Sequence, residues 1–330
     1  MREMTTGKTA LVLGATGGIG GAVARRLAAR GWQVKALHRR AASQSSQGGI
    51  VWIQGDALRP EDVAAAAQGV RLIVHAVNPP GYRHWDTLVP HMLEASIAAA
   101  TAERARILLP GTIYNYGPDA WPRPLTEASP QNPTTRKGAI RVAMERRLAA
   151  SGLDVLVVRA GDYFGPDAGN SWFSQALVKP GVPVARITNP GRTGVGHQWA
   201  YLPDVAETMV RLLEHPALPH GFATFHMDGQ WDADGMAMIG AIRRVLGRPE
   251  LKVGRLPWWL FRLIVPVNAF AREVTEIAPL WRRPIRLDNA RLVALLGAEP
   301  RTPLDEAVAA ALRGLGCLPG PTGATREALS

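Results

Sequence analysis

The chain has 330 residues, of which 47% are hydrophobic and 20% are charged, a balance typical of a globular protein and not of a disordered one. The single cysteine, Cys317, excludes an intramolecular disulfide framework and favours a reducing compartment. The net charge of +11 comes from basic residues scattered in short pairs, without the dense basic runs and interleaved aromatic residues that predict a nucleic-acid partner.

The sequence also lacks a targeting or membrane segment. Its N-terminus does not have the basic, apolar and small-residue layout of a signal peptide. The most apolar late segment, residues 258–271, is interrupted by Arg262 and is shorter than the roughly 20 residues that a membrane span needs. We therefore expect a cytoplasmic protein without a membrane partner.

Residues 8–165 predict alternating strands and helices. Short apolar runs predict the strands, and Ala-rich or amphipathic stretches predict the helices between them. The expected strands are 8–14, 33–38, 51–54, 72–76, 106–109 and 154–159, and the expected helices are 20–29, 61–68, 88–102 and 138–151. Strands that alternate with helices predict an α/β fold with a doubly wound parallel sheet.

The second half of the chain predicts a smaller C-terminal substrate-binding region. Residues 166–317 are expected to form this mixed or cap region, with 199–228 returning to the first domain. Residues 256–281 predict an apolar helical lid, and 304–314 a final amphipathic helix. Residues 1–7 and 318–330 are expected to be a flexible and a disordered tail.

A glycine-rich loop lies directly between the first expected strand and the first expected helix. Its sequence is Gly14-Ala15-Thr16-Gly17-Gly18-Ile19-Gly20, with the spacing G-x-x-G-x-x-G. Glycines let the turn tighten and let a pyrophosphate approach the backbone, while the helix N-terminus offers free N–H groups. The loop predicts a Rossmann-like dinucleotide-binding domain, with Gly14, Thr16, Gly17, Gly18, Ile19 and Gly20 at the cofactor.

The end of the second expected strand indicates which dinucleotide is bound. An acidic residue there binds the ribose 2′-OH of NAD, whereas an arginine accommodates a 2′-phosphate. The strand ends in His38-Arg39-Arg40 and has no acid. Two guanidinium groups attract the extra phosphate. We therefore expect His38, Arg39 and Arg40 to bind the cofactor, with NADP(H) preferred and NAD(H) as the alternative.

Taken in order, several motifs of residues 8–210 resemble the extended and atypical short-chain dehydrogenase/reductase superfamily, the NAD-dependent epimerase/dehydratase-like group. The resemblance places Asp56, beside Ala57, at the adenine, and Ala76, Val77 and Asn78 beside the cofactor ribose. Residues 112–117 resemble the Ser-rich stretch that ends in Tyr-Gly, which implies a catalytic role for Thr112. The segments 159–166 and 201–206 resemble two later motifs of the superfamily.

The chain departs from that superfamily at its catalytic motif, Tyr-x-x-x-Lys. Counting back from Glu145 puts Lys137 at the Tyr position and Arg141 at the Lys position, and no tyrosine lies between residues 130 and 145. Lys137 and Arg141 can still bind the cofactor ribose. Arginine, however, does not exchange a proton near neutral pH.

Three explanations of the missing phenol remain open. First, another group transfers the proton: Lys137, whose pKa burial near Arg141 would lower, or one of Tyr114, Tyr116, Tyr163 and His75. Second, the protein binds the cofactor without turning it over. Third, the chemistry changes to ene reduction, in which water protonates the product. The expected catalytic residues are Thr112, Lys137, Arg141 and Tyr163.

The expected function is an NADP(H)-binding oxidoreductase that reduces a small apolar carbonyl or enone. Six aromatic residues of the second half suit an apolar pocket: Trp172, Phe173, Trp199, Trp258, Trp259 and Trp281. His197 is interpreted as a surface histidine, with a pocket acid as the alternative. Alternatives for the whole protein are an inactive redox sensor and an epimerase or dehydratase of sugar nucleotides. We predict no metal site, and a homodimer is the default expectation for its size.

Overall fold

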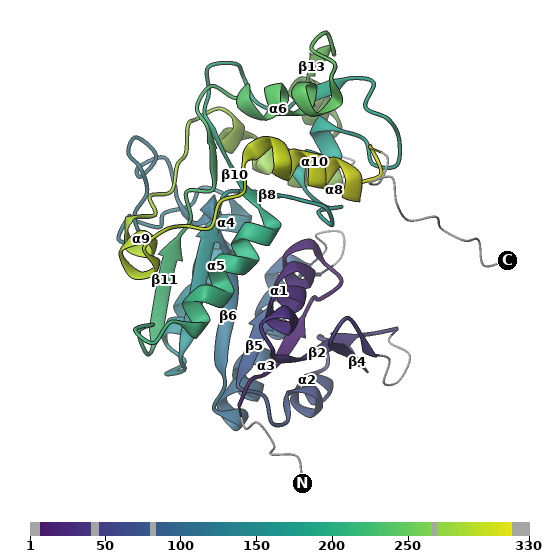
Figure 1. Ribbon diagram of the computed structural model, residues 1–330. Helices are drawn as coiled ribbons and strands as arrows, with labels where there is room; N and C mark the ends of the chain where they lie inside the picture. Colours follow the sequence, from purple (N-terminus) through teal and green to yellow (C-terminus); the bar gives the residue numbers. More distant parts are fainter. Residues whose placement is uncertain (1–6, 41–45, 80–83, 266–268, 319–330) are drawn as a thin grey trace, which may run out of the picture.

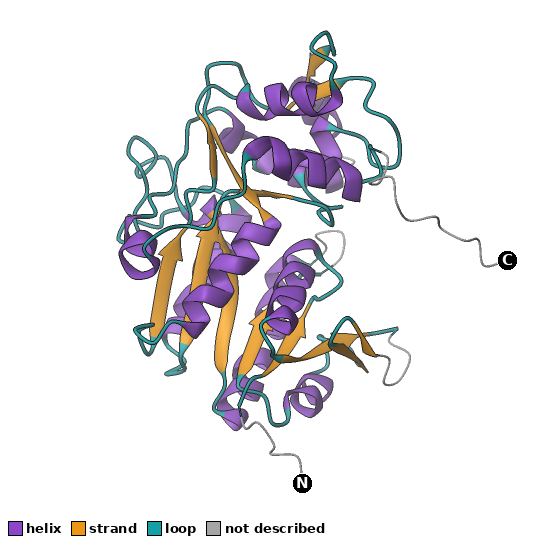
Figure 2. Ribbon diagram, in the orientation of Figure 1, coloured by secondary structure: helices purple, strands orange, loops and turns teal. Residues whose placement is uncertain are grey.

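The computed structural model describes residues 7–40, 46–79, 84–265 and 269–318 (Figure 1). A large sheet with helices on both faces forms the lower part of the molecule in this view, and a smaller part lies above it (Figure 2). Apart from Gly7 and Leu318, the two predicted tails lie outside the described residues. The predicted domain boundaries stay a prediction.

The main sheet confirms the doubly wound parallel α/β fold. Among the described residues its strand order is β11-β7-β6-β5-β1-β2-β4-β3, and all neighbours are parallel except β3 and β4. The bounds are β1 (Thr9–Leu13), β2 (Gln33–His38), β3 (Ser46–Gln47), β4 (Ile50–Gln54), β5 (Leu72–His75), β6 (Arg106–Thr112), β7 (Val155–Ala160) and β11 (Phe222–His226). The order reverses between β1 and β5, where such sheets bind ligands beyond their carboxyl ends.

The alternating side chains of β1 show why the sheet is covered on both faces. Ala10 and Val12 belong to one apolar core, together with residues of α1 and α5. Leu11 and Leu13 belong to the opposite core, together with residues of α2, α3 and α4. The bounds of these helices are α1 (Gly18–Ala29), α5 (Leu202–Glu214), α2 (Pro60–Ala67), α3 (Trp85–Glu103) and α4 (Arg136–Ala149).

The smaller part has its own apolar core and two small sheets. One sheet joins β8 (Asp162–Phe164), β10 (His197–Tyr201) and β12 (Gln230–Asp232), and the other joins β9 (Ile187–Asn189) and β13 (Val253–Arg255). Its remaining elements are η3 (Phe173–Leu177), α6 (Ala237–Leu246), α7 (Trp258–Ile264), α8 (Ala269–Glu276), η4 (Ala278–Trp281), α9 (Ala290–Leu296) and α10 (Leu304–Gly314).

Two elements differ from their predictions. The expected lid over 256–281 consists of separate short helices: α7 begins after Pro257, and Pro279 lies in the first turn of η4. The strand expected at 106–109 continues to Thr112 as β6, with Pro110 and Gly111 buried in register with β7. A Pro-Gly pair predicts a turn, but pairing with β7 overrides that preference.

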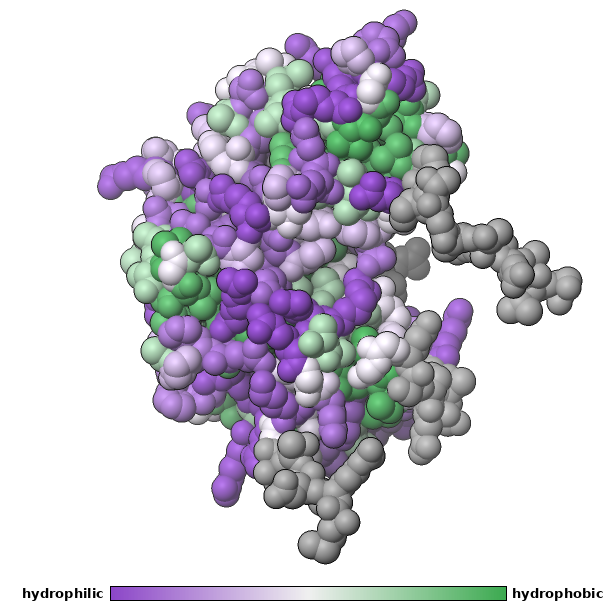
Figure 3. All heavy atoms as spheres, viewed as in Figure 1, coloured by the Kyte–Doolittle hydropathy of each residue, from purple (hydrophilic) through white to green (hydrophobic). Residues whose placement is uncertain are grey.

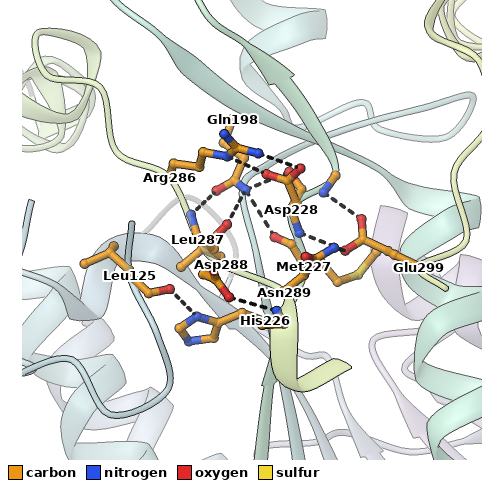
Figure 4. A network of polar contacts seen from close by, with 12 residues as sticks. Leu125, Gln198, His226, Met227, Asp228, Arg286, Leu287, Asp288, Asn289 and Glu299 are labelled. Atoms are coloured by element: carbon orange, nitrogen blue, oxygen red, sulfur yellow. Dashed lines mark hydrogen bonds and ion pairs between the residues drawn. The ribbon is translucent and has the colours of Figure 1, made fainter. Parts of the chain in front are cut away.

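Hydrogen bonds from side chains in distant parts of the sequence hold the segment that follows η4 against the end of β11 (Figure 4). The Gln198 amide donates to the carbonyl oxygens of Met227 and Asp228 at 3.2 and 2.6 Å and accepts from the Leu287 N–H at 2.9 Å. Glu299 accepts from the Asp228 N–H at 2.8 Å. The C-terminal part therefore packs in one defined way on the sheet.

Hydrophilic residues cover most of the face shown in Figure 3, and hydrophobic residues gather on it over α9. In the described ranges, no helix combines the length and the apolar character needed to cross a bilayer.

A buried ion pair joins α4 to β7. Arg159 donates from Nη2 and Nε to the two carboxylate oxygens of Glu145, and both residues are less than a tenth exposed. Asn115 donates to the same carboxylate at 2.9 Å. Tyr116 and His226 accept from the other terminal nitrogen of Arg159 at 2.7 and 3.1 Å. The pair therefore fixes α4 against the carboxyl end of the sheet.

Glu145→Ala is expected to lower the free energy of unfolding by about 3–5 kcal/mol, because it leaves the buried Arg159 charge without its partner. Glu94→Ala is the matched control, since Glu94 pairs with Arg147 where both side chains are about half exposed. Its loss should cost less than about 1 kcal/mol. Urea unfolding of both variants measures the difference, and similar losses would contradict the assigned role of Glu145.

Candidate cofactor and active site

The glycine loop follows β1 and packs directly against the end of β5. Gly14 has φ +89°, and a Cβ there would lie 2.5 Å from the Ala76 carbonyl oxygen. A Cβ on Gly20 would overlap the Gly14 carbonyl oxygen, and the Gly17 N–H donates to the same oxygen at 2.9 Å. The close approach of β1, α1 and β5 therefore depends on glycine at these positions.

The N-terminus of α1 is open to an anion. Gly17 is its N-cap, and the first turn has neither a side-chain cap nor an acidic residue. The first N–H groups of a helix have no acceptor within the helix, and they lie at its positive end. Thr16, Gly18 and Ile19 are exposed or half-buried around this terminus. The loop therefore fits a dinucleotide pyrophosphate.

His38 ends β2, the strand next to β1 in the sheet, and Arg39 and Arg40 follow it directly. The half-buried His38 ring lies edge-on to Trp52, with ring centres 6.0 Å apart. Arg39 and Arg40 are exposed, and neither forms an ion pair with a carboxylate in the described part of the chain. Two uncompensated positive charges therefore lie where the ribose 2′ position of a dinucleotide is expected.

Hydrogen bonds order the residues that follow β4 and β5. Asp56 accepts from the Leu58 N–H at 3.0 Å, and its own N–H donates to Asp62 at 2.8 Å, with Ala57 half-buried between them. Beyond β5, the Ala76 N–H donates to Leu13 at 3.0 Å. These bonds hold both segments at the same edge of the sheet as the glycine loop.

Lys137 and Arg141 lie on the first two turns of α4, which Thr135 caps at its N-terminus. Lys137 is 5% exposed, and its ammonium lies 5.9 Å from the centre of the Trp85 ring. The Arg141 guanidinium lies 5.4 Å from the same ring and donates to Asn78 at 3.0 Å. The half-buried Val77 precedes Asn78. The two cations and Trp85 therefore lie together beside the residues that follow β5.

Three of the proposed proton donors are held in buried hydrogen bonds. The Tyr116 phenol bonds Arg159 and His226, and the Tyr163 phenol donates to the Gly111 carbonyl at 3.3 Å. Burial raises the pKa of both phenols. His75 bonds Ser96 at 2.8 Å, and burial together with the Arg141 charge lowers the pKa of His75 to about 3. These positions do not favour Tyr116, Tyr163 or His75 as proton donors.

Tyr114 has a different environment. It lies in η2 (Ile113–Asn115), directly after β6, and is half-buried. Its N–H donates to the Thr112 hydroxyl at 2.8 Å, so Thr112 orients this turn and keeps its own proton to donate. A Cβ on Gly138 would overlap the Tyr114 carbonyl oxygen, so η2 packs tightly against the start of α4. Tyr114 therefore lies close to the position where the Tyr-x-x-x-Lys motif is missing.

A chain of polar groups continues from the Tyr114 phenol. The phenol donates to Asp162 Oδ1 at 3.3 Å, and His197 Nε2 lies 2.9 Å from Asp162 Oδ2. The His197 ring stacks on Trp281, with ring centres 3.7 Å apart and planes inclined by 8°. His197 is only 6% exposed, so its interpretation as a surface histidine is wrong. The sequence analysis did not single out Asp162.

A dinucleotide-binding protein with a doubly wound sheet is the class that this fold and this edge define. The model of a family described as NAD(P)H-binding matches residues 14–216, more than half of the chain. The chain belongs to this NAD(P)H-binding family, which agrees with the dinucleotide-binding fold that its resemblance to the extended short-chain dehydrogenase/reductase superfamily implied.

Solved structures show the same fold at low sequence identity. The enzyme WbmH of Bordetella bronchiseptica, in complex with NAD+, is 20% identical with a TM-score of 0.67, over 93% of this chain and 98% of that chain. A variant of UDP-glucuronic acid 4-epimerase from Bacillus cereus, in complex with a fluorinated UDP-glucuronic acid and NAD, is 15% identical with a TM-score of 0.73 over the same shares.

A nucleoside-diphosphate-sugar epimerase from Pseudomonas aeruginosa is 16% identical with a TM-score of 0.67, over 93% of this chain and 96% of that chain. Comparison with curated protein sequences found no match. In the portion of the chain that the structure covers, no group of three or more His, Cys, Asp or Glu side chains is arranged to hold a metal ion.

Proposed function

We propose that the protein is an NADP(H)-dependent oxidoreductase that reduces a small, fairly apolar carbonyl compound or enone. One observation carries the proposal. The Tyr114 phenol is connected through Asp162 to His197, and the backbone of Tyr114 packs against Gly138 at the start of α4, where the superfamily's own phenol is missing. A reductase needs such a donor at its cofactor, whereas a protein that only binds the cofactor does not.

Each group of residues at this site has its own role in the proposed reaction. When bound, the cofactor supplies a hydride to the substrate carbon. The backbone of residues 14–20 holds the pyrophosphate, while Arg39 and Arg40 hold the 2′-phosphate. Lys137 and Arg141 bind the ribose beside Asn78. Tyr114 donates the proton to the substrate oxygen, with Thr112 bonding the same oxygen, and His197 returns a proton to Tyr114 through Asp162.

The aromatic cluster that continues from Trp281, the ring stacked on His197, supports an apolar substrate. The Trp172 ring lies 5.2 Å from Trp281 and 5.9 Å from Trp258, centre to centre. Such a cluster suits an apolar carbonyl compound better than a sugar. The fluorinated UDP-glucuronic acid analogue and NAD bound to the Bacillus cereus enzyme support the second candidate, an epimerase or dehydratase of sugar nucleotides. Turnover of sugar nucleotides alone, in a panel that also contains ketones, aldehydes and enones, would favour that candidate.

NADPH is expected to bind wild-type protein more tightly than NADH does. Replacing Arg39 and Arg40 by alanine removes two charge-assisted bonds to the 2′-phosphate, each worth about 1.5–3 kcal/mol. The double variant should therefore lose a factor of about 10² to 10⁴ in NADPH affinity and keep its NADH affinity. Calorimetric titration of both cofactors measures this.

Arg71→Ala/Arg146→Ala is the control for that titration, because it removes the same charge from two exposed positions away from the loop. It should leave both affinities unchanged. Equal affinity of the wild type for NADH and NADPH would contradict the proposed cofactor preference. Binding of neither cofactor would contradict the proposed function itself.

A further inference from the structure

A cavity lies away from the residues assigned to the cofactor. It has a volume of about 700 Å³, within the range of small-molecule sites. It lies between the loop after η2 and the segment after α8, and none of the residues assigned above to the cofactor lines it. Its lining residues are Pro118, Trp121, Pro122, Arg123, Pro124, Trp231, Pro279, Arg282, Arg283, Pro284 and Arg286.

The lining is positively charged and contains no acidic residue. Arg286 is already engaged: it donates to both carboxylate oxygens of Asp228, at 2.8 and 3.1 Å, and its guanidinium lies 5.5 Å from the centre of the Trp231 ring. Arg123 and Arg283 are exposed and form no ion pair with the carboxylates that the structure describes. Two guanidinium groups at this cavity therefore remain available to an anion.

The two tryptophans of the cavity are fixed before any ligand arrives. The Trp121 indole N–H donates to the Tyr116 carbonyl at 2.9 Å. Trp231 pairs with Gln198 in the sheet of β10 and β12, and its ring lies so close to Gly196 that a Cβ there would come within 2.5 Å. Rigid aromatic walls lower the entropic cost of binding a flat ligand.

We propose that this cavity binds a small aromatic anion, a planar ring that carries one sulfonate, carboxylate or phosphate group. The ring would pack against Trp121 and Trp231, and the anion would accept hydrogen bonds from Arg123 and Arg283. Guanidinium groups bind such anions through two parallel hydrogen bonds, and apolar aromatic walls bind the ring. The site is independent of the proposed function, since it shares no residue with it.

Calorimetric titration of the full-length protein tests this site, with 2-naphthalenesulfonate, uridine 5′-monophosphate and inorganic phosphate as probes. We expect saturable binding of the sulfonate or of the nucleotide, and the better probe distinguishes an aryl acid from a nucleotide as the natural source. The neutral analogue 2-naphthalenemethanol lacks the anion, and phosphate lacks the ring. Each should therefore bind at least about tenfold more weakly than the better probe. Added NADPH should not compete.

Arg123→Gln/Arg283→Gln should weaken binding of the better probe at least about tenfold. Arg71→Gln/Arg146→Gln removes the same net charge elsewhere and should leave it unchanged. The proposal is overturned if neither aromatic probe binds, if phosphate binds as well as they do, if NADPH displaces them, or if both double variants lose the same affinity.

Discussion

Gly14→Ala is expected to abolish NADPH binding and to lower the free energy of unfolding by about 2–5 kcal/mol. A left-handed backbone costs an alanine about 1–2 kcal/mol, and the overlap with the Ala76 carbonyl adds about 1–3 kcal/mol. The neighbouring strand β5 must move to relieve that overlap. Because β5 leads into the residues beside the expected ribose, the displacement also disrupts the cofactor site.

Gly31→Ala separates these two effects. Gly31 has φ +80°, close to the +89° of Gly14, but nothing lies within 4 Å of a Cβ there. In this variant the free energy of unfolding should therefore fall only by the cost of the left-handed backbone, about 1–2 kcal/mol. It should bind NADPH like the wild type. Urea unfolding and cofactor titration of both variants give the comparison. Equal effects of the two substitutions would show that close packing of the loop on β5 is not what the site requires.

Tyr114→Phe is expected to lower kcat by a factor of about 10² to 10⁴, the usual contribution of a positioned proton donor. NADPH affinity should change far less than kcat, because Tyr114 is proposed to act on the substrate and its phenol donates to Asp162. His197→Gln should also lower kcat, since an amide cannot pass a proton to Asp162 as the imidazole of His197 can.

Tyr201→Phe is the matched control. Tyr201 lies in β10, the strand of His197, but packs on Phe164 in the apolar core, and its phenol bonds none of the relay groups. Steady-state kinetics with the best substrate of the panel should show wild-type turnover for this variant. Full activity of Tyr114→Phe would remove Tyr114 from the mechanism, and the buried Lys137 would then be the next proton donor to test.

Local sequence patterns were enough to predict the fold of the first half. Each predicted strand of the main sheet is a short apolar run, and the run at β1 fills both cores because both of its faces are covered. The glycine spacing predicted the loop for a similar reason: at Gly14 and Gly20 the backbone of another residue occupies the place of a side chain. The apolar runs and the glycine spacing are both short local patterns, so both can be recognised in the sequence.

The proton relay could not be predicted in this way. Tyr114, Asp162 and His197 come from η2, β8 and β10, and they meet because β8 and β10 pair in a sheet separate from the main one. Nor could the sequence separate Tyr114 from Tyr116, two positions further on. Tyr116 points into the buried Arg159 network, whereas Tyr114 reaches Asp162.

Detection of hydride transfer is the most direct test of the proposed oxidoreductase activity. NADPH carrying deuterium at both C4 positions of the nicotinamide ring is incubated with the protein and the panel of ketones, aldehydes and enones, and the products are analysed by mass spectrometry. We predict one deuterium in the reduced form of an apolar carbonyl compound or enone with wild-type protein, and almost none with Tyr114→Phe. Tight NADPH binding without deuterium in any product would contradict the oxidoreductase and favour a protein that binds the cofactor without turning it over.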